Sequence, residues 1–117
     1  MPFLFEHLTV YRRAVGFADR VLALAGTMPW QAEFLISQAV RAAISIAANL
    51  AEGNGRSTPA DRRRFFVMAR GSAHECVPLR ELARRRGLLA ESEHAEFKAE
   101  IEEIARMLAG LIRHTER

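Results

Sequence analysis

The sequence predicts an all-α fold, an antiparallel up-and-down four-helix bundle, and three observations support this. Apolar residues recur at spacings of three and four along four stretches of the chain. No segment alternates polar and apolar residues with the period of two that a half-buried strand requires. Glycine or proline residues separate the four stretches, where helices are expected to end. We therefore expect a single domain over residues 1–117. Its helices are expected to span approximately 5–26, 31–53, 59–86 and 91–115.

The first and last of these helices show the apolar pattern most clearly. Gly26 and Pro29 are expected to end the first helix, because glycine favours a helix C-terminus and the residue before proline avoids helical backbone angles. One apolar stripe of the first helix contains Leu8, Tyr11, Val15, Ala18, Leu22 and Ala25. The last helix carries Phe97, Ile101, Ile104, Leu108 and Leu111. Such faces are suited to packing in a bundle.

The two middle helices are delimited by turn residues. The second is expected to end at Gly53, and Thr58 followed by Pro59 is typical of the start of the third. Pro78 lies inside the third helix and is expected to kink or locally break it, and Gly87 is expected to close it. The expected inner face of the third helix consists of Phe65, Met68, Ala69, Cys76, Leu79, Leu82 and Ala83.

Composition indicates a cytoplasmic protein without a membrane span. The chain has one cysteine, so it cannot form an internal disulfide, and we find no signal peptide. No uncharged stretch approaches the roughly 20 apolar residues that cross a bilayer. Seventeen basic residues face fourteen acidic ones, for a formal net charge of +3. The excess of arginine lies between positions 41 and 88, whereas the last helix is acidic.

A line of polar residues follows the second helix through an otherwise alanine-rich and apolar segment. At about 100° per residue, the line occupies an arc of roughly 80°. We call it the polar seam; its members are Gln38, Arg41, Ser45, Asn49 and Glu52. Polar groups that enter a packed environment need partners, so we expect the seam to meet complementary groups on another helix or subunit. Glu75 is the expected partner of Arg41, and Arg56 or Arg70 that of Glu52.

Arginines form a second line, on the outer side of the third helix. This arginine strip contains Arg62, Arg63, Arg70, Arg80, Arg84 and Arg85. Guanidinium groups bind phosphate in a two-pronged manner, and an exposed Phe66 would offer a base a stacking surface. The strip therefore predicts a nucleic-acid contact. The alternative is that it packs against the acidic last helix of the same or a neighbouring chain.

Catalytic and metal-binding motifs receive little support. Ser72, His74 and Glu75 lie too close together on one helix to converge as a triad. Glu91 and His94 match one Glu-x-x-His motif, whereas a di-iron bundle needs two such motifs and two further glutamates. We expect no enzymatic activity, no metal and no cofactor.

Four stretches of the chain match a known pattern and together cover nearly its whole length. These are Leu8-Thr9-Val10-Tyr11-Arg12-Arg13-Ala14, Met28-Pro29 with Glu33, the segment from Ser45 to Gly53 with Gly55-Arg56, and the segment from Arg64 to Glu75. In these stretches the chain resembles the four-helix bundle family first noticed in intervening sequences of bacterial 23S ribosomal RNA genes. Two positions depart from the family pattern. Val40 replaces one of two basic residues after Gln38, and Cys76-Val77-Pro78 stands where a leucine and a glutamine are usual.

The resemblance implies a four-helix bundle that assembles as a homo-oligomer, in the form of a ring of five. It further implies similarity to the accessory variability protein of diversity-generating retroelements, a basic pentamer that binds nucleic acid and a reverse transcriptase. Together with the arginine strip, it predicts a non-enzymatic oligomeric binding or scaffold protein whose partners are itself, RNA or DNA, and a nucleic-acid enzyme. The alternative is a structural or protein-interaction module in which the strip is a subunit contact.

Overall fold

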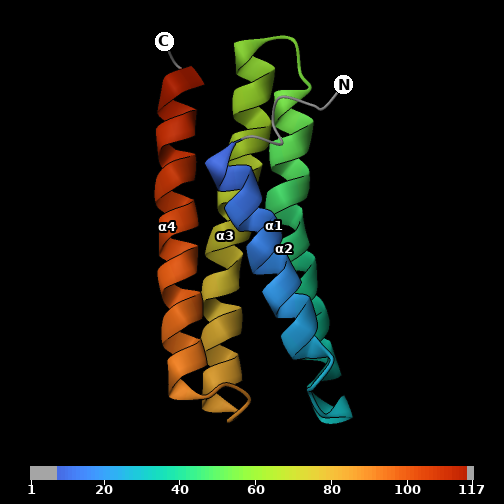
Figure 1. Ribbon diagram of the computed structural model, residues 1–117. Coiled ribbons are helices and arrows are strands. Elements are labelled where there is room, and N and C mark those ends of the chain that lie inside the picture. The colour runs from blue at the N-terminus through green and yellow to red at the C-terminus, as the bar shows by residue number, and fades with distance from the viewer. Residues whose placement is uncertain (1–7, 116–117) are drawn as a thin grey trace.

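Four long helices make up most of residues 8–115, the part of the chain described by a computed structural model (Figure 1). They are α1 (Thr9–Ala25), α2 (Glu33–Asn54), α3 (Pro59–Arg85) and α4 (Glu91–Thr115), with a short 3-10 turn, η2 (Trp30–Ala32), before α2. No strand occurs in this part of the chain. The predicted all-α four-helix bundle is thus confirmed. Residues 5–7 of the expected first helix lie outside the described residues.

Consecutive helices pack side by side and run in alternating directions (Figure 1). α1 packs on α2, α2 on α3 and α3 on α4, and a smaller contact between α1 and α4 closes the bundle. At the end that carries the α1–α2 and α3–α4 turns, the pair of α1 and α2 diverges from the pair of α3 and α4 (Figure 1).

The ends of α3 follow the predicted capping chemistry. The hydroxyl oxygen of Thr58 accepts a hydrogen bond of 3.1 Å from the backbone N–H of Asp61, and Pro59 occupies the first turn, where its missing donor is not needed. At the other end Gly87 adopts a φ of 73°, a backbone region that favours glycine. The N–H of Leu88 then donates to the carbonyl of Ala83 at 2.9 Å.

Pro78 does not break α3, which continues from Pro59 to Arg85. Proline removes the donor that would bond the carbonyl of His74, four residues earlier. Both residues are exposed, so water can satisfy that carbonyl and the helix can continue.

The core of the bundle is built from one face of each helix. Its largest fully buried side chains are Phe66, Ile46, Leu50, Ile104 and Leu108. The expected exposure of Phe66 is therefore wrong: its ring is only 2% exposed. It packs against Gly53 of α2, where the absence of a side chain leaves room for the ring.

Two residues of α3 that were expected to point inward are exposed. Met68 is 46% and Leu82 50% exposed, because the core side of α3 is occupied by Ala69, Ala73 and Cys76.

The segment Trp30–Asn54 has a mean hydropathy of 1.4 and could cross a membrane by length and composition alone. In this fold α2 packs between α1 and α3, and 22% of the apolar window is buried. Core helices of bundles pass the same composition test.

Candidate interaction surfaces

The middle of the polar seam connects α2 to α3 through hydroxyl groups. The Oγ atoms of Ser45 and Ser72 lie 2.8 Å apart, and the Ser72 hydroxyl lies 3.2 Å from the carbonyl of Met68. If Ser72 donates to that carbonyl, Ser45 donates to Ser72. Asn49 completes the chain, because its Nδ2 donates to Ser45 Oγ at 3.0 Å and to the Ser45 carbonyl at 2.9 Å. These half-buried bonds fix the register of α2 against α3.

The charged ends of the seam are exposed. Glu52 pairs with Arg56 at 2.7 Å, and not with Arg70. Arg41 and Glu75 lie at the same level of the antiparallel pair, because Arg41 is four residues before Ser45 and Glu75 three residues after Ser72. Nevertheless, the structure shows no ion pair between them, and both are exposed. Gln38, the remaining member, is half-buried.

Three large apolar side chains lie in line with Arg41 and Glu75. Phe34 precedes Arg41 by seven residues on α2, and Met68 and Leu82 lie seven residues before and after Glu75 on α3. Seven residues are nearly two helical turns, so each set forms one line along its helix. We call this surface the α2–α3 outer face; its members are Phe34, Arg41, Met68, Glu75 and Leu82. Phe34 is 81% exposed.

The members of the arginine strip contact different groups. Arg84 lies 3.2 Å from Glu91 of α4, and Arg85 lies 3.4 Å from Glu81. Arg62 donates to the carbonyl of Arg56 at 2.9 Å. Arg62, Arg84 and Arg85 therefore contact groups of their own chain, and Arg84 does so on α4, as the alternative interpretation expected.

The other strip members differ in environment. Arg63 is exposed, and Arg70 is half-buried beside α4. Arg80 is half-buried, and its Nε and Nη1 atoms are buried without a hydrogen-bond partner in the described chain. The six arginines thus do not form one uniform cationic surface.

Acidic residues of α4 bind α1, which the sequence analysis did not identify. Arg13 donates to both carboxylate oxygens of Glu100, at 3.0 and 2.9 Å. Arg20 pairs with Glu96 at 2.7 Å, and its guanidinium lies 4.9 Å from the centre of the Phe97 ring. The sequence pattern that could have indicated these pairs is the spacing of the charged residues. Glu96 and Glu100 are four residues apart on α4, and Arg13 and Arg20 are seven residues apart on α1.

A groove between α3 and α4 brings Arg70 together with His74 and Arg106. Its volume is about 1180 Å³, including open solvent. Gly71 is among the residues that line it, and a Cβ atom added there would meet no atom within 4 Å. Arg106 pairs with Glu103, whereas Arg70 has no ion pair among residues 8–115. Glu102 also lines the groove, so Arg70 is a cation without an ion pair in a groove of mixed charge.

Reactive side chains are sparse over the described part of the chain. No group of three or more histidine, cysteine, aspartate or glutamate residues there is arranged to hold a metal ion, and this includes the region of Glu91 and His94. Cys76 is buried, and burial, followed by the nearby charge of Glu75, raises the pKa of its thiol to about 12. At neutral pH Cys76 is therefore a protonated core residue.

Comparison with known proteins gives a family match. The sequence model of the 23S rRNA-intervening sequence protein family matches residues 6–110. A protein of unknown function from Bacteroides thetaiotaomicron, described as a member of the S23 ribosomal protein family, has a similar structure with a TM-score of 0.80. The two chains are 22% identical, and the similarity covers 89% of this chain and 98% of the other. No curated protein matches the chain.

Proposed function

The chain belongs to the 23S rRNA-intervening sequence protein family. From its surfaces we propose that it is a non-catalytic scaffold that assembles with copies of itself. The observation that carries this proposal is the α2–α3 outer face. It combines three exposed apolar side chains with two opposite charges that are not paired to each other. We expect the protein to act in the cytoplasm.

Self-association would remove an unfavourable exposure and supply missing partners. Burial of apolar surface stabilises an assembly by roughly 25 cal/mol per Å². The exposed apolar surface here belongs to Phe34, Met68 and Leu82. Arg41 and Glu75 carry complementary charge, so Arg41 of one copy can meet Glu75 of the next copy. When the α2 part of this face (Phe34 and Arg41) in one copy contacts the α3 part (Met68, Glu75 and Leu82) of the next copy, the two contacting surfaces differ, and such a contact generates a ring when the rotation closes. A ring of five, as the family resemblance implies, is the form that we propose.

Charge reversal at two positions tests this assembly. We expect wild type to sediment as an oligomer, and Arg41→Glu and Glu75→Arg each to shift it toward the 13.1 kDa monomer. The double variant should recover the oligomer, because the swapped charges can pair again between copies. Circular dichroism should report the same helix content for all four proteins, since both positions are exposed.

Two results would contradict the proposal. One is a wild-type protein that remains monomeric over a wide concentration range in analytical ultracentrifugation. The other is an oligomer whose mass is unchanged by either single reversal. A mass that differs from five chains would contradict the ring of five alone.

A second candidate function is binding of RNA or single-stranded DNA, and the α3–α4 groove favours it. Arg70 and His74 lie one helical turn apart on one wall, and Arg106 lies on the other. Phosphate groups are the ligands that guanidinium groups of this kind bind best. A nucleic-acid enzyme would then be a further partner of the assembled scaffold.

Two single substitutions distinguish nucleic-acid binding in the groove from nonspecific attraction between the basic protein and phosphate. One neutralises Arg70 in the groove, and the other neutralises Arg84, which is paired with Glu91. We expect Arg70→Gln to weaken binding of a single-stranded oligonucleotide and to reduce the slope of log K against log salt by about 0.7. Arg84→Gln is the matched control, because Arg84 is already paired with Glu91, and it should change the slope less. Fluorescence anisotropy at several salt concentrations measures both. Absence of binding at low salt, or equal effects of the two changes, would exclude this site.

A further inference from the structure

The exposed side of α2 carries a line of residues that repeats at spacings of three and four. This spacing is typical of a helix seam that packs against another helix. We call it the α2 line; its members are Phe34, Ser37, Arg41, Ile44 and Ala48. All five are exposed, and the line extends the α2 part of the outer face over about four helical turns.

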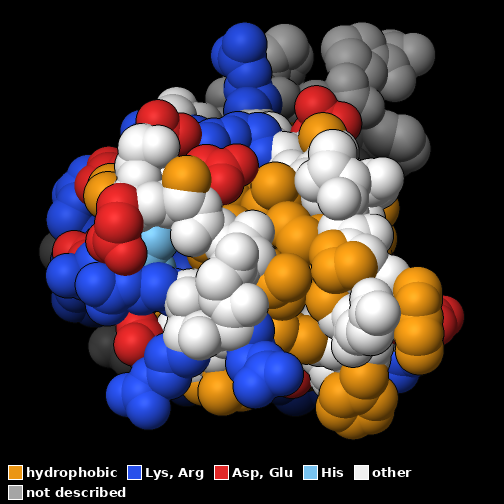
Figure 2. All heavy atoms as spheres, turned by 90° about the horizontal axis from the view of Figure 1, so that it is seen from below, with side chains coloured by type: hydrophobic (Ala, Val, Ile, Leu, Met, Phe, Trp, Pro, Cys, Tyr) orange, Lys and Arg blue, Asp and Glu red, His pale blue; other side chains and the backbone are white. Residues whose placement is uncertain are grey.

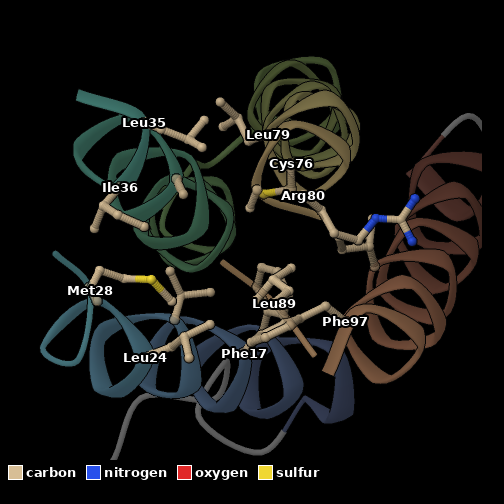
Figure 3. Close-up of a pocket in the computed structure, with 15 residues that line it drawn as sticks. Phe17, Leu24, Met28, Leu35, Ile36, Cys76, Leu79, Arg80, Leu89 and Phe97 are labelled. Atoms are coloured by element: carbon tan, nitrogen blue, oxygen red, sulfur yellow. The ribbon is translucent and has the colours of Figure 1, made fainter. Parts of the chain in front are cut away.

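A second line with the same kind of spacing follows α3. We call it the α3 line; its members are Met68, Ser72, Glu75, Leu79 and Leu82. Met68, Glu75 and Leu82 are exposed, whereas Ser72 and Leu79 are half-buried at the junction with α2. Leu79 points there toward Leu35 of α2 (Figure 3).

The order of the spacings determines how the two lines can meet. From Phe34 to Ala48 the steps along α2 are three, four, three and four residues. On α3 the same steps occur only when the line is read backwards, from Leu82 to Met68. An antiparallel contact therefore brings all five members of each line together in layers. A parallel contact centred on the charged members matches only the centre and the two ends.

The antiparallel layers join side chains of matching chemistry. In the end layers Phe34 would meet Leu82, and Ala48 would meet Met68, so that apolar surface covers apolar surface. In the central layer the positive and the negative charge of the outer face would meet. Nearly parallel or antiparallel helix axes are the geometry in which such layers repeat.

The two lines also lie at the same height within one chain. The hydroxyl oxygens of Ser45 on α2 and Ser72 on α3 are 2.8 Å apart, which fixes the relative height of the two helices. Arg41 is four residues before Ser45 and Glu75 three residues after Ser72, so the two charges differ in height by about 1.5 Å. Charges of neighbouring copies therefore meet without a shift along the helices. A shift by one turn, about 5.4 Å, would place Arg41 level with Ser72 or Leu79.

The antiparallel order also gives the exposed Trp30 a partner. Hydrophobic side chains reach the surface at this end of the bundle mainly on the side of α1 and α2 (Figure 2). Trp30 lies four residues before Phe34 and is 79% exposed, and Arg86 lies four residues after Leu82. In the antiparallel order Arg86 of the next copy is level with Trp30, where its guanidinium can stack on the indole ring. In the parallel order Arg64 would take that place.

We infer that α2 of one copy packs antiparallel against α3 of the next copy, at the height that it has against its own α3. Neighbouring copies are then related by a rotation about an axis parallel to the helices, with no rise along that axis. Rotation without a rise gives a closed ring, whereas a rise gives a filament. The inference rests on the proposed self-association and adds the orientation and the register of the contact.

Disulfide formation between chains that carry one engineered cysteine each tests the orientation. Ala48→Cys and Met68→Cys are co-expressed on chains of different length, so that a mixed disulfide must join two copies. We expect this disulfide to form under mild oxidation, because the two positions share a layer. The native Cys76 is present in every chain and points into the bundle (Figure 3). Burial raises the pKa of its thiol to about 12, so it does not compete.

Ala48→Cys with Leu82→Cys is the matched control. In the antiparallel order Leu82 lies fourteen residues, or about 21 Å, from the layer that contains Ala48, and no disulfide spans that distance. A parallel contact predicts the reverse, with a disulfide to Leu82→Cys and none to Met68→Cys. Sedimentation of the reduced samples shows that each pair of variants still assembles.

A double-mutant cycle tests the same contact without cysteines. Trp30→Ala and Arg86→Gln should each raise the dissociation constant of the oligomer. Their combined effect should fall short of the product of the single effects by about two- to fivefold, because the two side chains contact each other. Trp30→Ala and Arg64→Gln should act independently. Analytical ultracentrifugation over a concentration series measures all of these constants.

Three outcomes would overturn the inference and leave self-association intact. The first is a mixed disulfide to Leu82→Cys, or coupling of Trp30 with Arg64 in place of Arg86. The second is an oligomer that forms neither disulfide, because the two lines are then not in contact. The third is a mass that grows without limit as concentration rises, which indicates a rise between copies. A wild-type monomer, in contrast, removes the proposed self-association and this inference together.

Discussion

Phe66→Ala is expected to lower the free energy of unfolding by about 3 to 5 kcal/mol. The ring is 2% exposed and belongs to the central core cluster with Ile46, Leu50 and Leu108. Truncation removes the transfer free energy of the ring and leaves a cavity that the rigid helices cannot fill completely. Urea denaturation followed by circular dichroism measures the change.

Phe34→Ala is the matched control for this experiment. Phe34 is 81% exposed, so its truncation should change stability by no more than about 0.5 kcal/mol. According to the proposed assembly, it should weaken self-association instead. Equal losses of stability at Phe34 and Phe66 would show that the core assignment is wrong.

Gly53→Ala is expected to destabilise the protein by about 1 to 3 kcal/mol. A Cβ atom at this position would lie 2.7 Å from Cε1 of Phe66 and 3.0 Å from Cβ of Phe65. Because both phenylalanines are buried, neither can move without displacing other core atoms. The overpacking therefore outweighs the gain of up to about 1 kcal/mol that alanine normally brings to a helix.

Gly16→Ala should have the opposite sign. Gly16 lies on the exposed side of α1, and an added Cβ would meet no atom within 4 Å. We expect a stabilisation of up to about 1 kcal/mol from helix propensity alone. Thermal or urea unfolding of the two variants in parallel provides the test, and a stabilising Gly53→Ala would contradict the close α2–α3 packing.

The helices and their ends could be predicted from the sequence because their signals are local. Thr58 and Pro59 start α3 and Gly87 closes it through interactions with residues only a few positions away. Local signals do not determine which of two apolar neighbours on α3 enters the core. Phe66 rather than Met68 is buried because Gly53, thirteen residues earlier and on another helix, leaves space for its ring.

The candidate surfaces were predictable only in part, because sequence spacing is a local signal and does not contain the contacts between helices. Spacing placed Ser45 and Asn49 on one line, and the structure adds Ser72 as a partner of Ser45. Spacing also placed six arginines on one side of α3, but it could not show that Arg84 is paired with Glu91 while Arg70 faces a groove. Pairing depends on the distance between helices, which a single helical wheel does not contain.

The closure between α1 and α4 combines one buried ring pair, Phe17 with Phe97, with exposed charge. Arg13 with Glu100 and Arg20 with Glu96 span a boundary where the two helices make the smallest contact of any adjacent pair. Exposed ion pairs weaken as ionic strength rises. Local opening of the native protein should therefore begin along this boundary, and amide hydrogens of α1 should exchange with deuterium earlier than those of α2 when salt is added.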